Sequence, residues 1–189
     1  MAPRPQVVAV LVPSESVNRR LAQAPLQRDY CKCPTLRRAW ISSFRSTIRH
    51  FFFVTFNTHH RRRLLANAQL NNELVAFAKS GEQRAIAVGR YVIMLDHIHI
   101  FVSGHQDFLL TQWVRLLKRA LSKVISQSRP HWQKGFFDHL IRHGESYSEK
   151  WEYVRQNPVR AGLVETPEDW PWQGEIVPID QQSVDRETL

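Results

Sequence analysis

Residues 91–103 read YVIMLDHIHIFVS and contain two apolar runs joined by a short polar turn. The first run, Tyr91–Met94, is rich in β-branched and aromatic residues, which is typical of a buried strand. Leu95–Asp96 is predicted to form a tight turn, and the alternating residues of His97–Ser103 predict a second strand. The stretch therefore predicts a β-hairpin at the centre of an antiparallel sheet.

The second strand of this hairpin carries two histidines at alternate positions. Successive side chains of a strand point to opposite faces, so His97 and His99 share one face while Ile98 and Ile100 occupy the other. Two imidazoles separated by about 6.6–7 Å along a strand can converge on one metal ion. The alternative is a pair of histidines that form hydrogen bonds within the sheet.

The other predicted elements follow from apolar periodicity and from residues that begin or end helices and strands. Before the hairpin they are a strand over 51–56 and a helix over 64–78 ended by Gly81. The first hairpin strand is predicted from Arg84 to Met94, and Gly104 is predicted to end the second hairpin strand. After the hairpin come a helix over 108–126, a strand within 135–142, and a last helix from a Ser146 cap to about Asn157, where Pro158 limits it. The order β-α-β-β-α-β is typical of an α+β, ferredoxin-like fold, with helices on one face of an antiparallel sheet and a further C-terminal helix.

Positive charge is concentrated in the first third of the 189-residue chain. Residues 1–63 contain 12 Lys and Arg against 2 Asp and Glu, whereas the whole chain has a net charge of +9. This excess permits nucleic-acid binding, and a solvated basic tail is the alternative. Residues 1–45 are predicted to be a basic, disordered extension, residues 46–175 a single domain, and residues 176–189 a C-terminal tail.

Other features of the composition exclude several classes of protein. No apolar run reaches the ~18–20 residues of a membrane helix, and no secretory signal is evident, so we predict a cytoplasmic protein without membrane association. Cys31 and Cys33 have no second pair with which to form a zinc site, and we interpret them as incidental thiols.

The predicted last helix carries a second set of candidate residues. Tyr153 and Asn157 are four positions apart and so project from one face of the helix. Tyr147, Trp151 and Val154 form a different, apolar stripe that can pack on the sheet. Tyr153 is therefore a candidate nucleophile beside an amide oxygen, and a half-exposed amphipathic tyrosine is the alternative.

Four motifs in this order resemble those of the REP-associated tyrosine transposases, a group of single-tyrosine transposases with two histidines around a bulky apolar residue (the HUH motif). The motifs are YVIMLDHIH at 91–99, WQKGFFDH at 132–139, YVRQNPVRAGL at 153–163 and EDWPW at 168–172. The resemblance covers about residues 50–173. The chain departs from the family pattern at Leu95, where proline is usual.

The resemblance implies a metal-dependent transposase that nicks and rejoins DNA. His97 and His99 match the family's metal ligands, Asn157 its third ligand and Tyr153 its nucleophile. It further implies Mg²⁺ or Mn²⁺, a 5′-phosphotyrosine intermediate with a free 3′-hydroxyl, and a single-stranded or hairpin-forming palindromic DNA substrate, without a nucleotide cofactor. We expect a monomer with its active site in cis, and a dimer is the alternative.

Basic side chains throughout the predicted domain are candidate phosphate contacts, and for each of them a solvated surface charge is the alternative. They are Arg61, Arg62, Arg63, Arg115, Lys118, Arg119, Lys123, Arg142, Arg155 and Arg160.

Three other functions compete with this interpretation. A histidine-triad nucleotide hydrolase needs a third histidine at position 101, where this chain has Phe101. A replication-initiator nickase shares the chemistry but carries further domains that this length excludes. A catalytically silent regulator that binds hairpin DNA stays open, and a Tyr153→Phe variant would distinguish it, because a pure binder loses nothing by that change.

Overall fold

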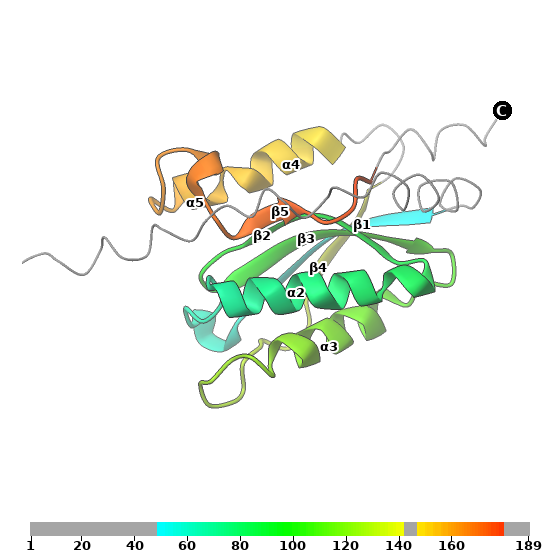
Figure 1. Cartoon of the computed structure of the whole chain (residues 1–189), viewed down its shortest axis with the longest axis horizontal. Coiled ribbons are helices and arrows are strands. Elements are labelled where there is room, and N and C mark those ends of the chain that lie inside the picture. Colours follow the sequence, from blue (N-terminus) through cyan, green and yellow to red (C-terminus); the bar gives the residue numbers. More distant parts are fainter. Residues whose placement is uncertain (1–48, 142–146, 180–189) are drawn as a thin grey trace, which may run out of the picture. The chain divides into compact units, whose positions relative to one another are not determined.

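A computed structural model describes residues 49–141 and 147–179, and it contains a five-stranded antiparallel sheet in the order β4-β1-β3-β2-β5 (Figure 1). The strands are β1 (Arg49–Asn57), β2 (Ala87–Ile93), β3 (His97–His105), β4 (Phe137–Ile141) and β5 (Gln173–Glu175); the helices are α2 (Ala68–Ser80), α3 (Leu110–Leu121), α4 (Tyr147–Arg155) and α5 (Asn157–Arg160); and short 3-10 turns are η1 (His59–Arg61), η2 (Glu82–Arg84) and η3 (Pro167–Asp169). The predicted βαββαβ order is confirmed, but the predicted last helix is divided. Helix α4 ends at Arg155, and Asn157 begins the separate helix α5, whose first turn accommodates Pro158, so Tyr153 and Asn157 do not lie on one continuous helix. The N-terminal extension, the Ser146 cap and Arg142 lie outside the described residues.

The predicted hairpin forms the middle of the sheet. The amide of Met94 donates to the carbonyl of His97 at 2.8 Å, which closes the tight turn at Leu95–Asp96. In β3, Ile98 and Ile100 are fully buried on one face, while the two histidines lie on the other. The alternation expected from the sequence is therefore present.

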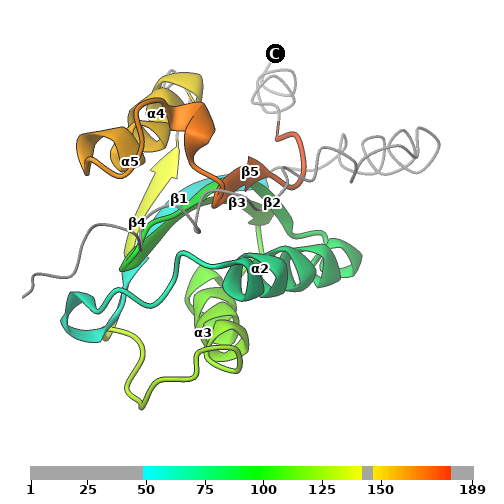
Figure 2. The same cartoon turned by 60° about the vertical axis from the view of Figure 1, so that its left-hand side comes forward.

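Helices α2 and α3 cover one face of the sheet, as predicted (Figure 2). Their buried side chains form the main hydrophobic core with the inward residues of β1, β2 and β3, through Leu70 and Leu74 of α2 and Trp113 and Leu117 of α3. Burial of this apolar surface is the main stabilising contribution to the domain. This face is closed to solvent and carries no candidate for chemistry.

Helix α4 packs against the opposite face of the sheet, the face that carries the histidines (Figures 1 and 2). The predicted apolar stripe is confirmed, because Tyr147 and Val154 are buried and Trp151 is half-buried against the sheet. Gly89 of β2 allows this approach: a Cβ at that position would lie 2.9 Å from the hydroxyl of Tyr147 and 2.7 Å from Ile179.

Some predicted boundaries were wrong, because tertiary contacts overrode local pattern. The helix begins at Ala68 and not at residue 64, since the amides of Leu64 and Leu65 both donate to the carbonyl of Leu95, and Asn67 caps the helix. Strand β3 runs through Gly104 to His105. Helix α3, Leu110–Leu121, is shorter than the predicted helix over 108–126.

The predicted start of the first hairpin strand at Arg84 was also wrong. Residues Glu82–Arg84 form the turn η2, and the left-handed backbone of Ala85 separates this turn from the strand, which begins at Ala87.

Strand β5 was not predicted. It pairs with the outer edge of β2, where Tyr91 lies opposite Gly174, and the amide of Ile93 donates to the carbonyl of Trp172 at 2.8 Å. The indole of Trp170 donates to the carbonyl of Ile93 at 3.0 Å. No helix of the described residues is long and apolar enough to span a membrane.

Candidate functional site

The two histidines lie on the sheet face that α4 only partly covers. Their ring centroids are 4.7 Å apart and the rings are nearly perpendicular. His99 lies opposite Thr55 of β1, whose hydroxyl is 2.8 Å from its Nδ1 atom. The ring of Phe53 stacks on His99 at 5.6 Å and 15°. These two contacts from β1 hold the imidazole of His99 in one orientation.

His97 is held by a carboxylate. Its Nδ1 atom lies 2.6 Å from Oδ1 of Asp96, and Oδ2 of the same carboxylate forms an ion pair with Nε of Arg61 at 2.8 Å. Because a carboxylate can only accept, the proton of neutral His97 resides on Nδ1, and Nε2 keeps its lone pair. A carboxylate that orients a histidine in this way is typical of metal-binding histidines.

Both histidines are held in the neutral form by their surroundings. Burial lowers the pKa of His99 to about 3, with further lowering from His97, Arg160 and Arg61. Burial also lowers the pKa of His97, against the opposing effect of Asp96. Neutral imidazoles are the form that binds metal ions, so both side chains are ready to act as ligands near neutral pH.

The two histidines alone provide too few ligands for a divalent ion, so a further group must supply a ligand. The described residues contain no cluster of three or more His, Cys, Asp or Glu that could hold a metal. The predicted third ligand, Asn157, supplies an amide oxygen, a donor that suits Mg²⁺ and Mn²⁺. Its Oδ1 atom accepts from Arg160 at 2.6 Å and has a second lone pair available.

Arg160 connects the C-terminal residues with the histidines. Its guanidinium lies 4.1 Å from the ring centroid of Tyr153 and donates to the carbonyl of Tyr153 at 2.5 Å as well as to Asn157. Its charge also contributes to the lowered pKa of His99. Arg160 therefore brings Tyr153 and Asn157 together and places a positive charge within range of the histidines.

Tyr153 differs from the other tyrosines that the structure describes. Its side chain is 67% exposed, whereas Tyr91 and Tyr147 are buried. Burial raises the pKa of each of these two to about 12, and each hydroxyl has a hydrogen-bond partner, Asn71 for Tyr91 and the amide of Arg90 for Tyr147. Among the described tyrosines, only Tyr153 presents its hydroxyl away from a packed environment.

The predicted phosphate contacts divide into three groups. Three have their charged groups engaged within the fold: Arg62 donates to the carbonyls of Ser128 and Pro130, Lys118 donates to those of Gln133 and Gly135, and Arg155 pairs with Glu152 and Glu168. Two, Arg61 and Arg160, lie at the histidine site.

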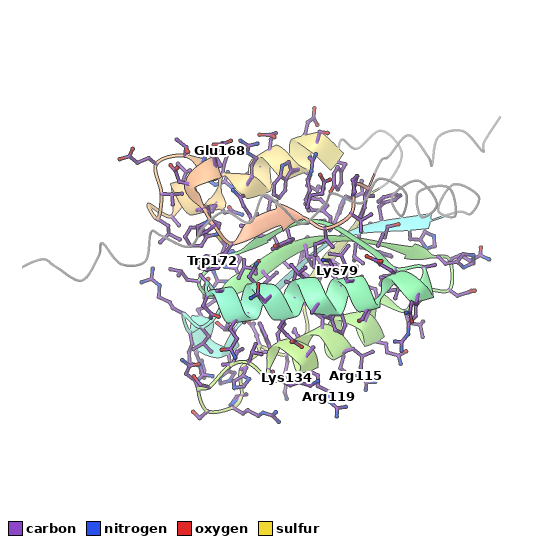
Figure 3. All side chains as sticks on the ribbon, viewed as in Figure 1. Lys79, Arg115, Arg119, Lys134, Glu168 and Trp172 are labelled. Carbon is purple, nitrogen blue, oxygen red and sulfur yellow. The ribbon has the colours of Figure 1, made fainter. Side chains whose placement is uncertain are left out.

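The remaining described candidates are exposed: Arg63, Arg115, Arg119 and Lys123. Figure 3 shows Arg115 and Arg119 projecting from α3 away from the sheet. Arg115 and Arg119 lie on the side of the sheet opposite the histidines. A DNA strand that contacted both these arginines and the histidine site would have to pass around the edge of the sheet.

Sequence reasoning missed the residues that hold the histidines. Thr55 is the one polar residue of the run 51–56, and that interruption was the available signal. Asp96 was assigned only to a turn, although an acidic residue directly before the first histidine can reach its ring. Arg160 was considered only as a phosphate contact.

Comparison with known proteins identifies the family. A family profile described as "Transposase IS200 like" matches residues 46–156, more than half of the chain, and the chain belongs to this family. Within it, the chain is 28% identical to the REP-associated tyrosine transposase of Escherichia coli K12 over 124 residues, which cover 64% of this chain and 73% of that protein. A protein of Haemophilus influenzae that provisionally carries the same name is 25% identical over 135 residues, 64% of this chain and 77% of the relative.

The fold has a match among solved structures. A REP-associated tyrosine transposase bound to a REP hairpin superimposes with a TM-score of 0.57 at 24% identity, covering 66% of this chain and 75% of that one. The resemblance inferred from the four motifs is confirmed. The protein is a transposase-family member with the fold of that group.

Proposed function

We propose that this protein nicks and rejoins single-stranded DNA at hairpin-forming repeats, with Tyr153 as the nucleophile. The observation that carries the proposal is the pair of histidines whose Nδ1 atoms are engaged by Thr55 and Asp96. Within the described residues, the hydrogen bonds of both rings involve Nδ1 and none involves Nε2, so the Nε2 atoms are the candidate ligands. The names of the relatives, and the hairpin bound to the solved relative, support DNA as the substrate.

His97, His99 and the amide oxygen of Asn157 would hold Mg²⁺ or Mn²⁺. When bound there, the ion supplies Lewis-acid polarisation of the scissile phosphate and neutralises charge that develops on it. The protein's own residues orient both rings through Thr55 and Asp96. The Asp96 carboxylate selects the tautomer of His97 that leaves its Nε2 free, and the Thr55 hydroxyl can accept from Nδ1 of His99 in the same tautomer.

The oxygen of Tyr153 attacks the scissile phosphorus, while the phenol loses its proton. The bond from phosphorus to the 3′ oxygen breaks, and that oxygen takes up a proton, which leaves a 5′-phosphotyrosine ester and a free 3′-hydroxyl. The reverse reaction, with the same or another 3′-hydroxyl as the nucleophile, rejoins DNA and needs no nucleotide cofactor. Arg160, which lies on the ring of Tyr153, positions the phenol for this attack.

We further propose that the site works in cis in a monomer. Val154, one residue after the proposed nucleophile, packs with Val92 of the same chain's β2 and with Met94 directly after it, so α4 rests on its own sheet. A stable dimer on gel filtration with light scattering would contradict this part of the proposal.

The test is formation of a covalent protein–DNA adduct. Purified protein is incubated with Mg²⁺ or Mn²⁺ and hairpin DNA taken from sequence flanking its own gene, and the products are separated on a denaturing gel. We expect an adduct with the natural protein and none with Tyr153→Phe or His97→Ala. Tight hairpin binding without an adduct under either metal would instead support a catalytically silent binding protein.

A further inference from the structure

Exposed large apolar side chains are rare in the described part of the chain, and one of them lies beside the histidine site. The strongly exposed ones are Leu109, Phe137 and Tyr153, and Phe137 of β4 is 59% exposed. Ile141, four residues later on the same strand, is buried. A single exposed apolar residue is common on protein surfaces, so the position of Phe137 matters more than its exposure.

Phe137 lies in the same row of the sheet as His99. It is opposite Thr55 on β1, and Thr55 is opposite His99 on β3. Residues that lie directly opposite each other share a face, so the phenyl ring is on the histidine face. Two strand spacings separate the Cα atoms of Phe137 and His99, about 10 Å. That distance equals about three nucleotides at a stacked rise of 3.4 Å, and fewer in an extended strand.

A chain of aromatic rings connects Phe137 to the histidine site. Phe137 meets Phe53 in an edge-to-face arrangement at 6.4 Å and 69°, and Phe53 stacks on His99 at 5.6 Å. The ring of Phe137 thus contacts Phe53 on the side nearer the histidines, and more than half of the residue is exposed to solvent. A phenyl ring has no hydrogen-bonding group, so it can recognise a base only through its π-face, in a way that tolerates any sequence.

We propose that Phe137 is a stacking platform for one unpaired base of the DNA strand, within about three nucleotides of the bond that is cut. The proposal rests on the proposed function, since it places DNA across the histidine face. The platform would hold the strand flat against β4 and β1 and so keep the scissile phosphate over His97 and His99. An unpaired base has a free face for this contact, whereas a base inside the hairpin stem is already stacked.

The test measures DNA binding separately from cutting. In the Tyr153→Phe background, binding of a hairpin with single-stranded flanks on both sides is measured against a series in which each flank position in turn is abasic. We expect one abasic position to weaken binding about 5- to 150-fold, the usual range for a base on an aromatic side chain. Phe137→Ala should weaken binding of the intact DNA by a similar factor and should no longer respond to that abasic position.

Two matched variants control for other effects. Phe137→Tyr keeps an aromatic ring and should retain most of the binding. Leu109→Ala removes a strongly exposed aliphatic side chain just before α3, which packs on the opposite face, and should leave DNA binding unchanged. Thermal melting of each variant checks that the fold is intact.

Two outcomes would overturn the stacking platform. One is that Phe137→Ala binds the intact DNA as tightly as the parent protein does. The other is that each abasic position weakens binding by the same factor in Phe137→Ala as in the parent protein, so that the two changes act independently. If coupling is present but the natural Tyr153 protein forms no adduct with either metal, the proposed cutting function fails while the platform stands. If the adduct forms and coupling is absent, the function stands and the platform is wrong.

Discussion

The two faces of the sheet are built from alternate residues of the same strands, yet they differ in almost every property. On one face, Ile98 and Ile100 are fully buried beneath α2 and α3 in a continuous apolar core. On the other, His97 and His99 are fixed by polar contacts, and Phe137 is exposed in the same row of the sheet as His99. The difference teaches that one face supplies the stability of the domain, while the other is free to present reactive groups.

The largest effects are expected from exchanging the roles of neighbouring residues in β3. Ile100→Ala should lower the free energy of unfolding by about 2–5 kcal/mol, because it leaves a cavity in the core, and folded molecules should still form the DNA adduct. His99→Ala should abolish the adduct and lower stability by no more than about 1.5 kcal/mol, the contribution of a typical hydrogen bond. Urea denaturation and the adduct gel, run well below both melting temperatures, measure these quantities. Equal destabilisation by the two variants would break the distinction between the faces.

A smaller effect is expected from Thr55→Val, which preserves side-chain shape and removes the hydroxyl that contacts His99 Nδ1. The apparent affinity for Mn²⁺, measured by the metal dependence of adduct formation, should fall about 10- to 100-fold, as is typical when the partner of a metal-binding histidine is lost. Thr58→Val is the matched control, because Thr58 is a buried threonine directly after β1 whose hydroxyl donates to the backbone carbonyls of Arg62 and Asp96 and not to a histidine ring. An unchanged metal dependence for Thr55→Val would show that the hydroxyl does not orient His99.

A further effect is a pH dependence of stability without metal. Burial lowers the pKa of His99 in the folded protein to about 3, below its ordinary value of 6.5. The unfolded chain therefore binds more protons between these values, and stability that is fully present above pH 6.5 is lost as pH falls toward 3. In EDTA, the melting temperature of the natural protein should fall relative to His99→Gln between pH 7 and pH 4.5. A constant difference would mean that His99 is not held neutral by burial.

The sequence was sufficient for the central hairpin because alternation is a local pattern. It correctly assigned the two histidines to one face and Ile98 and Ile100 to the other. It also separated Tyr153 from the apolar stripe of α4, since helical spacing is equally local. The predicted roles of His97, His99, Asn157 and Tyr153 in chemistry stay predictions.

What sequence reasoning missed depends on contacts between distant residues. Strand β5 is three residues long and exists through its pairing with β2, so its own pattern is too short to be recognised. Lys118 and Arg119 are neighbours on α3 and were indistinguishable as phosphate contacts. In the fold, the ammonium of Lys118 is engaged by the carbonyls of Gln133 and Gly135, whereas Arg119 is exposed.

The position of β4 and β5 at the two outer edges of the sheet has a consequence for the fate of cut DNA. Helices α4 and α5 lie between these strands in the chain, so the segment that carries Tyr153 is anchored to both borders of one sheet. If Tyr153 forms the proposed ester, the DNA end attached to it would stay on the same molecule as the histidines, at a high effective concentration. Resealing within one complex would then follow first-order kinetics, with a rate that dilution of the protein does not change.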